Sequence, residues 1–289
     1  FIGGIFCVTN DSMQSMDYSK DKTPEKITKV TPPAEVKSEV QSELGTLPNA
    51  KLIPNLAWVA QTFNNCSSVA LMITLSHWGI KDTQEAIAEG TRPWNNLKGN
   101  NDDKSVTLHE LAAYAKAKHG MVTYVRPNGN IELLKKFVAN DIPVLTRALM
   151  YPKDDIVHYR VIRGYNEAKK IVIESDGVEG KEEEYSYEDW MYMWKDFNYS
   201  YLIIVPEGKR KLAESLLADQ LNEQTAYEGA KARAQSELAK NPNSLVYKYN
   251  NITALYYLGD YEGTIKEFEK IESGLSRRKL WYQMEPIEA

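Results

Sequence analysis

The pattern of apolar and polar residues divides the chain into a polar beginning, a mixed middle part and a helical end. From about Thr9 to Pro48 the residues are mostly Ser, Lys, Glu, Asp, Thr and Pro, with almost no aromatic side chains. Such a segment cannot bury enough apolar surface to offset the entropy lost on ordering, so a disordered tether is expected there. Folded structure is expected to begin near Leu52.

Three apolar segments in the middle part predict helices over 66–79, 107–120 and 131–140. The first is preceded by Asn65 and ends on Gly79, which are favourable residues for the two ends of a helix. Thr107 and Glu110 form a capping-box pattern at the start of the second helix. The third helix is expected to stop before Pro143.

After Pro143, β-branched and aromatic residues become frequent and predict strands. The expected strands cover 144–148, 158–164, 170–176 and 199–205. Helices followed by antiparallel strands indicate the α+β class, with N-terminal helices packed on an antiparallel sheet.

From Lys209 onward the pattern is helical throughout. The turn from Leu258 to Glu262 lies between two amphipathic segments and resembles the hairpin of a tetratricopeptide repeat. It covers one repeat well, whereas about three are normally needed for an independent superhelix, so a small helical bundle is the alternative. The expected organisation is an export or tether segment over 1–50, a catalytic-sized domain over 51–208 and a helical module over 209–289.

Composition narrows the classes of partner. The 289 residues carry a net charge of −5 with an isoelectric point near 5.6, and Lys and Arg are scattered among Asp and Glu. This distribution gives no basic patch for phosphate groups, so nucleic acid is not an expected partner. The longest apolar run at the start, Phe1 to Val8, is far shorter than the ~20 residues that span a bilayer, so no transmembrane segment is expected.

The first residues also bear on location. Phe1 to Val8 lack an initiator Met and resemble the end of an export segment, which predicts an extracytoplasmic protein. A fragment end is the alternative. Lipidation of Cys7 is disfavoured by the bulky Phe6 before it, and a bridge between Cys7 and Cys66 would occupy the best candidate nucleophile.

Cys66 is the first candidate for chemistry. A thiol in the first turn of a helix meets the positive end of the helix dipole and unpaired N–H groups, and both favour the thiolate. A small buried apolar residue is the alternative. His77 lies 11 residues later on the same predicted helix, about 16 Å away, and is excluded as the base. His109 and His119 are expected to be surface or cap residues, and no spacing suggests a metal or cofactor site.

His158 is the candidate base because of its predicted partner. A hairpin centred on residue 167 places His158 opposite Asp176, with the two side chains about 5 Å apart. A helical thiol and an imidazole oriented by a carboxylate are the parts of a Cys-His-Asp triad, whereas a cross-strand contact without chemistry is the alternative. Gln61, five residues before Cys66, is a candidate to stabilise an oxyanion together with the Cys66 N–H group.

These residues resemble those of the C39-like cysteine peptidases, the papain-like relatives of the peptidase domains of bacterial bacteriocin exporters. The matching segments lie between Leu52 and Pro206 and are Gln61 to Cys66, His77 to Gly79, Asn128 to Gly129, Ile142 to Val144, Val157 to Tyr165, Asp176 and Tyr201 to Pro206. The family often has Gly-Pro after the cysteine, where this chain has Ser67 and Ser68.

The resemblance implies a papain-like fold and a division of roles. It implies that Cys66 attacks the substrate, His158 transfers the proton, Asp176 orients His158, and Gln61 lines the oxyanion hole. The expected function is hydrolysis of a peptide or amide bond in a peptide or protein substrate, through a thioester. The alternatives are a transferase with the same triad and a catalytically silent module that binds protein partners through its helical repeats.

Overall fold

The computed structural model describes residues 46–92 and 106–289, and its centre is an antiparallel sheet. In the described part of the chain the sheet has seven strands in the order β2-β7-β3-β4-β5-β6, with β1 pairing to β4. The strands are β1 (Ala50–Leu52), β2 (Val122–Arg126), β3 (Val144–Leu149), β4 (Val157–Asn166), β5 (Ile171–Asp176), β6 (Gly180–Ser186) and β7 (Tyr201–Val205).

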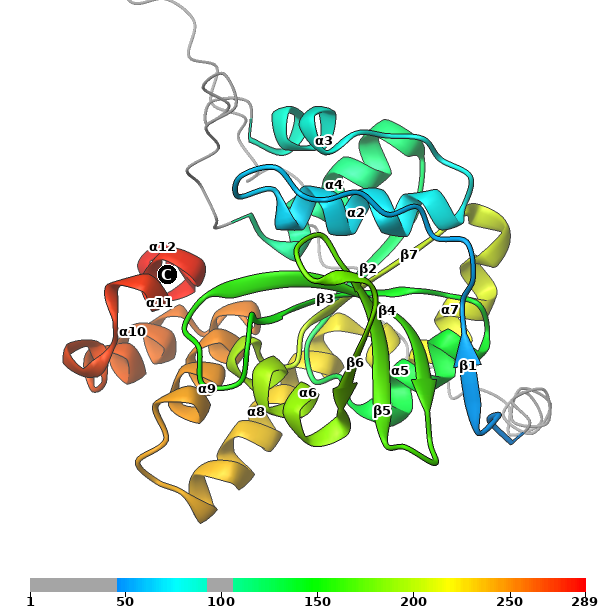
Figure 1. Ribbon diagram of the computed structural model, residues 1–289. Helices are drawn as coiled ribbons and strands as arrows, with labels where there is room; N and C mark the ends of the chain where they lie inside the picture. Colours follow the sequence, from blue (N-terminus) through cyan, green and yellow to red (C-terminus); the bar gives the residue numbers. More distant parts are fainter. Residues whose placement is uncertain (1–45, 93–105) are drawn as a thin grey trace, which may run out of the picture. The chain divides into compact units, whose positions relative to one another are not determined.

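Helices cover both faces of this sheet (Figure 1). One face carries α2 (Cys66–His77), α3 (Gln84–Thr91) and α4 (Leu108–His119). The other carries α5 (Ile131–Ala139), α6 (Tyr187–Trp194) and α7 (Arg210–Leu217). The predicted α+β class, with N-terminal helices packed on an antiparallel sheet, is therefore confirmed.

The α2 helix is buried along nearly its whole length, because it lies between the sheet and the neighbouring helices. Leu71, Ile73 and Leu75 are all fully buried in the core. Ser67 and Ser68 are also buried, and their small side chains leave room for close packing at the start of the helix. Cys66, the candidate nucleophile, is therefore held at the start of a tightly packed helix.

The capping predictions hold for one helix and fail in part for another. Thr107 and Glu110 form the expected capping box of α4, which ends on Gly120 in the left-handed conformation at φ 64°. Asn65 occupies the N-cap position of α2 but makes no side-chain cap hydrogen bond. Its side-chain amide donates to Thr62 Oγ1 at 2.6 Å. Asn65 therefore connects the start of the helix to the extended segment that precedes it, residues 57–65, which we call the approach segment.

The last part of the described chain is helical, as predicted. It contains α8 (Glu223–Lys240), α9 (Leu245–Tyr257), α10 (Tyr261–Glu269), α11 (Arg277–Tyr282) and α12 (Glu285–Glu288). Asn198, which precedes β7, donates to the carbonyl oxygen of Asn250 in α9 at 2.9 Å, and the Asn250 amide donates to the carbonyl oxygen of Lys195. The tetratricopeptide assignment and a domain boundary at residue 208 stay predictions.

Two further expectations concern segments outside the sheet. The predicted tether and Cys7 fall on residues 1–45, which lie outside the described residues. Within the described ranges, no helix combines the length and the apolar character needed to cross a bilayer.

Candidate active site

Cys66 is the first residue of α2, as predicted. Its thiol is free and half-buried. The first turn of the helix contains no acidic residue, and the N–H groups at a helix start have no partner within the helix. The thiol therefore lies at the positive end of the helix dipole.

His158 lies on β4 and connects the thiol to a carboxylate. Its Nε2 donates to Asp176 Oδ2 at 2.6 Å, and both side chains are buried. The imidazole also makes a hydrogen bond with Cys66. Because Nε2 is taken by Asp176, Nδ1 is the ring nitrogen left for the thiol. The structure thus brings the three predicted residues into one contiguous chain of side chains.

The predicted register of the β4–β5 hairpin is wrong, although the predicted neighbours are in contact. Val161 pairs with Ser175, so the register places Arg160, not His158, beside Asp176. The strands shift against each other between Ile162 and Gly164. Because side chains two residues apart on a strand lie on the same face, His158 still reaches Asp176 diagonally.

Charge on the His158–Asp176 pair is set by competition between burial and hydrogen bonding. Burial disfavours the charged imidazole, but hydrogen bonds to Asp176 and Cys66 outweigh it and raise the pKa of His158 from 6.5 to about 9. Burial also disfavours a charged Asp176, yet the hydrogen bond from His158 and the charges of His158 and Arg160 lower the pKa of this carboxyl group. At neutral pH the pair is therefore an imidazolium and a carboxylate.

We expect the imidazole of His158 to stay protonated up to about pH 9. Because the pKa of His158 is raised in the folded chain, protonation of this ring stabilises the folded state. This stabilisation is complete below pH 6.5 and is lost as the pH rises through 9. The full loss corresponds to about 3 kcal/mol of unfolding free energy. NMR titration of the ring and urea unfolding between pH 6 and 10 would measure both effects. A ring that titrates near pH 6.5 would contradict this assignment.

Gln61 approaches the site from an extended segment. Its backbone N–H donates to the carbonyl oxygen of Gly177 at 2.8 Å, and its side-chain Oε1 is buried without a hydrogen-bond partner among the described residues. Gln84 holds the same segment, because its Oε1 accepts from the Thr62 N–H at 2.8 Å and its Nε2 donates to the carbonyl oxygen of Ala60. Gln61 is thereby fixed beside Cys66 from two directions.

A cleft of about 360 Å³ opens over Cys66 and His158. Among the described residues that line it, none is Asp, Glu, Lys or Arg. Its walls come from the approach segment, the β3–β4 loop and the β5–β6 turn, and they include Gln61, Phe63, Met150, Ile156 and Val178. The cleft thus offers apolar side chains around the thiol.

The other histidines are placed elsewhere. His77 makes a hydrogen bond with the carbonyl oxygen of Asp141 at 2.6 Å, and His119 contacts Asp82 at 2.6 Å. His109, expected at the surface, is half-buried and stacks on Tyr257 with ring centroids 5.3 Å apart. Tyr257 belongs to the helical end of the chain, so the sequence around residue 109 does not predict this contact.

Sequence reasoning missed three residues that support the site. Arg160 contacts Asp176, with 3.1 Å from Nε to Oδ2, and Trp58 Nε1 donates to the Asp176 carbonyl oxygen at 2.6 Å. Gln84 holds the approach segment, as described above. Arg160 carries a signal in the sequence, because it follows His158 by two residues and shares its face of the strand. Trp58 and Gln84 carry no comparable local signal.

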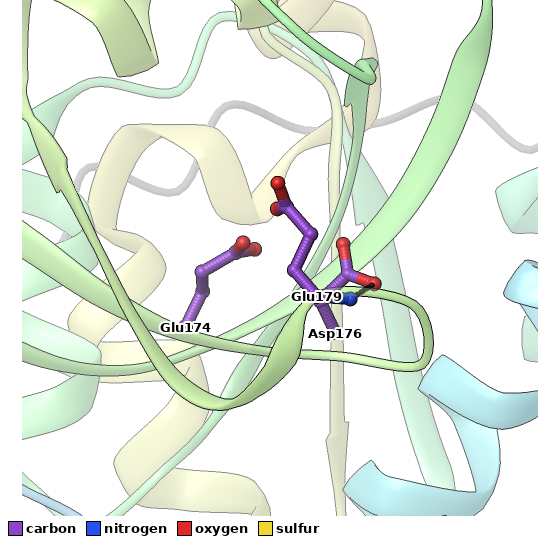
Figure 2. A group of neighbouring side chains, drawn as sticks. All are labelled: Glu174, Asp176 and Glu179. Carbon is purple, nitrogen blue, oxygen red and sulfur yellow. Dashed lines mark hydrogen bonds between the residues drawn. The ribbon is translucent and has the colours of Figure 1, made fainter. Parts of the chain in front are cut away.

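Asp176 also belongs to a group of three neighbouring carboxylates. Glu174, Asp176 and Glu179 gather at the end of β5 and the following turn, as Figure 2 shows, and their oxygen atoms lie within 4.8 Å of one another. The guanidinium of Arg160 contacts all three, at 2.9 Å, 3.1 Å and 3.2 Å respectively. Arg160 is therefore the common ion-pair partner of these three carboxylates.

Comparisons with known proteins found similar chains among the solved structures. None of the curated proteins searched is a significant match. Among solved structures, a C39-like peptidase candidate from Bacillus anthracis is 15% identical, covers 55% of this chain and 99% of its own, and has a TM-score of 0.45. The peptidase domain of Streptococcus ComA, a bifunctional ABC transporter, is 19% identical, with 53% and 100% coverage and a TM-score of 0.41. Xylellain, a cysteine protease from Xylella fastidiosa, is 10% identical, with 64% and 94% coverage and a TM-score of 0.42.

The family assignment comes from a match in sequence. Residues 36–207, more than half of the chain, match the model of the Peptidase_C39 like family. This range contains Gln61, Cys66, His158 and Asp176. The chain therefore belongs to the Peptidase_C39 like family of cysteine peptidases.

Proposed function

We propose that the chain hydrolyses peptide bonds with Cys66 as nucleophile, His158 as proton carrier and Asp176 as the group that orients His158. The observation that carries this proposal is the continuous contact from the Cys66 thiol through the imidazole to the buried Asp176 carboxylate. A structural cysteine has no need of an imidazole held in this way. Activation of a thiol does need it.

The proposed reaction has two steps. The Cys66 thiolate attacks the carbonyl carbon of the scissile bond, and the Gln61 amide together with the Cys66 N–H stabilises the oxyanion. The imidazolium of His158 then gives its proton to the leaving amine as the carbon–nitrogen bond breaks, which leaves a thioester on Cys66. In the second step His158 takes a proton from water, and the resulting hydroxide attacks the thioester. The carbon–sulfur bond breaks, which releases the carboxylic acid and leaves the Cys66 thiolate beside the imidazolium of His158.

The lining of the cleft supports a class of substrate. Its walls include the apolar side chains of Met150, Ile156 and Val178. Ile156 and Val178 expose 37% and 47% of their surface, so they can contact a ligand without moving. An extended peptide with uncharged, apolar side chains next to the scissile bond therefore fits better than an acidic or basic one. An extracytoplasmic location, where the substrate would meet the enzyme, is proposed from the N-terminal residues alone.

Gly177 provides a test of the role of Gln61. A Cβ atom at this position would lie 3.1 Å from Gln61 Cβ and 3.0 Å from Val69 Cγ1, so Gln61 would have to shift by a few tenths of an ångström. We expect Gly177→Ala to lower kcat by about tenfold, because an oxyanion donor acts only from a narrow range of positions. Gly208→Ala is the matched control, since no heavy atom of the residues that the structure describes lies within 4 Å of its added Cβ. Equal kcat in both variants would remove Gln61 from the mechanism.

Cleavage of a defined peptide library tests the function directly. The full chain is incubated with unstructured peptides that place apolar, acidic or basic residues at the centre, and the products are identified by mass spectrometry. The proposal predicts cleavage beside apolar residues, with ¹⁸O from labelled water in the new carboxyl group. Exchange onto an added amine without ¹⁸O incorporation would favour a transferase. Binding without any covalent change would favour the silent module.

A further inference from the structure

Arg160 contacts the Asp176 carboxylate and the cleft residue Met150, but it is not itself among the described residues that line the cleft. It lies on β4, two residues after His158, so the two side chains point to the same face of the sheet. The arginine is fully buried. Its Nε lies 3.1 Å from Asp176 Oδ2, and His158 Nε2 contacts the same oxygen at 2.6 Å. The carboxylate is therefore held between two cationic side chains, by an ion pair with Arg160 and a hydrogen bond from His158.

The other arms of the guanidinium reach both walls of the cleft. Nη1 donates to the carbonyl oxygen of Leu149 at 2.8 Å, and Nη2 donates to that of Met150, which lines the cleft. Nη2 also lies 3.2 Å from Glu179 Oε2, next to the cleft residue Val178. One side chain thus connects the Asp176 carboxylate with the β3–β4 loop and the β5–β6 turn.

The charges around Arg160 show why a planar, permanently charged group is required. Glu174 is fully buried with its Oε1 2.9 Å from Arg160 Nε, and burial raises the pKa of Glu174 to about 8 even though Arg160 opposes the rise. The ring of Tyr185 lies 5.3 Å from the guanidinium, and its hydroxyl donates to Glu179. A lysine ammonium is a point donor and cannot reach two carbonyl groups and the carboxylates together.

We propose that Arg160 is a positioning residue that aims the Asp176 carboxylate at His158 and fixes both walls of the cleft relative to the thiol. The proposal deepens the proposed function and rests on it. Other charged or titratable groups around His158 and Arg160 also influence the titration of His158. They are Cys66 of α2, Glu174 and Asp176 of β5, Glu179 of the β5–β6 turn, Tyr185 of β6, and Tyr151 of the β3–β4 loop.

The test compares Arg160→Lys with Arg163→Lys. Arg163 is on the same strand and equally buried, but its guanidinium donates to the carbonyl oxygens of Ile53 and Lys181. Both variants keep the positive charge and lose the planar set of N–H donors of the guanidinium. We expect Arg160→Lys to lower kcat at least tenfold, raise KM several-fold, and move the pKa of His158 from about 9 toward 6.5 by NMR. We expect Arg163→Lys to change kcat and KM by less than about twofold.

A second variant covers the case in which Arg160→Lys does not fold. Arg160→Met combined with Glu174→Gln removes the guanidinium and keeps the buried carboxyl position beside it permanently uncharged, which avoids an uncompensated ion at Glu174. The same losses in kcat and KM are expected, with a cooperative unfolding transition retained. Kinetic constants and a His158 titration like those of Arg163→Lys would overturn the proposal. The NMR titration needs no turnover, so it separates failure of this proposal from failure of the peptidase assignment.

Discussion

Replacing Cys66 with alanine is expected to lower kcat/KM for peptide hydrolysis by at least about 10⁴-fold. The substitution removes the nucleophile and leaves the cleft, the imidazole and the carboxylate in place. Because the side chain is half-buried and alanine is smaller, the unfolding free energy should fall by no more than about 1 kcal/mol. Cleavage of an apolar peptide, followed by chromatography, measures the loss.

Cys7→Ser is the matched control for this experiment, because it removes the other thiol of the chain. We expect it to keep kcat/KM within about twofold of the unmodified chain. Activity that survives in Cys66→Ala would contradict the assignment of the nucleophile. Loss of activity in Cys7→Ser alone would move the nucleophile to Cys7.

Asp176→Asn is expected to lower kcat by about 10³-fold. Asparagine has nearly the same shape, but it carries no charge to stabilise the imidazolium of His158, to which Asp176 is bound at 2.6 Å. The alkaline limit of activity, set by the pKa of His158 at about 9, should move toward 6.5 because the hydrogen bond and charge of Asp176 support that value. The pH profile of kcat/KM measures this change.

Glu174→Gln is the control for replacing a buried carboxyl group of β5 by an amide. Glu174 is buried and contacts Arg160 as Asp176 does, but its carboxyl group is not bonded to His158. Its raised pKa of about 8 means that it carries a proton at neutral pH, so glutamine resembles it closely. We expect kcat within about threefold of the unmodified chain. A loss as large as that of Asp176→Asn would mean that the carboxylate cluster as a whole, and not the contact with His158, supports activity.

The helices α2, α4 and α5 could be predicted from the sequence because their signals are local, whereas α3 and α6 were not predicted. For α4 the signals lie at the two ends of the helix: the capping box of Thr107 and Glu110 at its start and the left-handed Gly120 at its end. The edge strand β6 could not be predicted, because its Lys and Glu residues carry no apolar alternation, as is common for a strand that has a neighbour on only one side. The short strand β1 exists only through its pairing with β4.

The site was predictable in its residues more than in its geometry. Cys66 lies on the expected helix start and contacts His158, and His158 contacts Asp176. The register that led to Asp176 was wrong, since the shift between Ile162 and Gly164 depends on packing across the sheet. The role of Gly177 depends on its close approach to Gln61, a residue more than a hundred positions earlier. Such long-range contacts leave no periodic signal in the sequence.

The most direct test of the central claim is the rate of Cys66 alkylation by iodoacetamide as a function of pH. It is measured in the Cys7→Ser background, so that one thiol reacts, and in the same protein with His158→Gln. The account predicts fast alkylation near pH 6 that is lost in the His158→Gln variant, because the imidazolium holds the thiol as thiolate. Slow alkylation in both proteins, rising only near pH 8.5 as for an ordinary thiol, would contradict it.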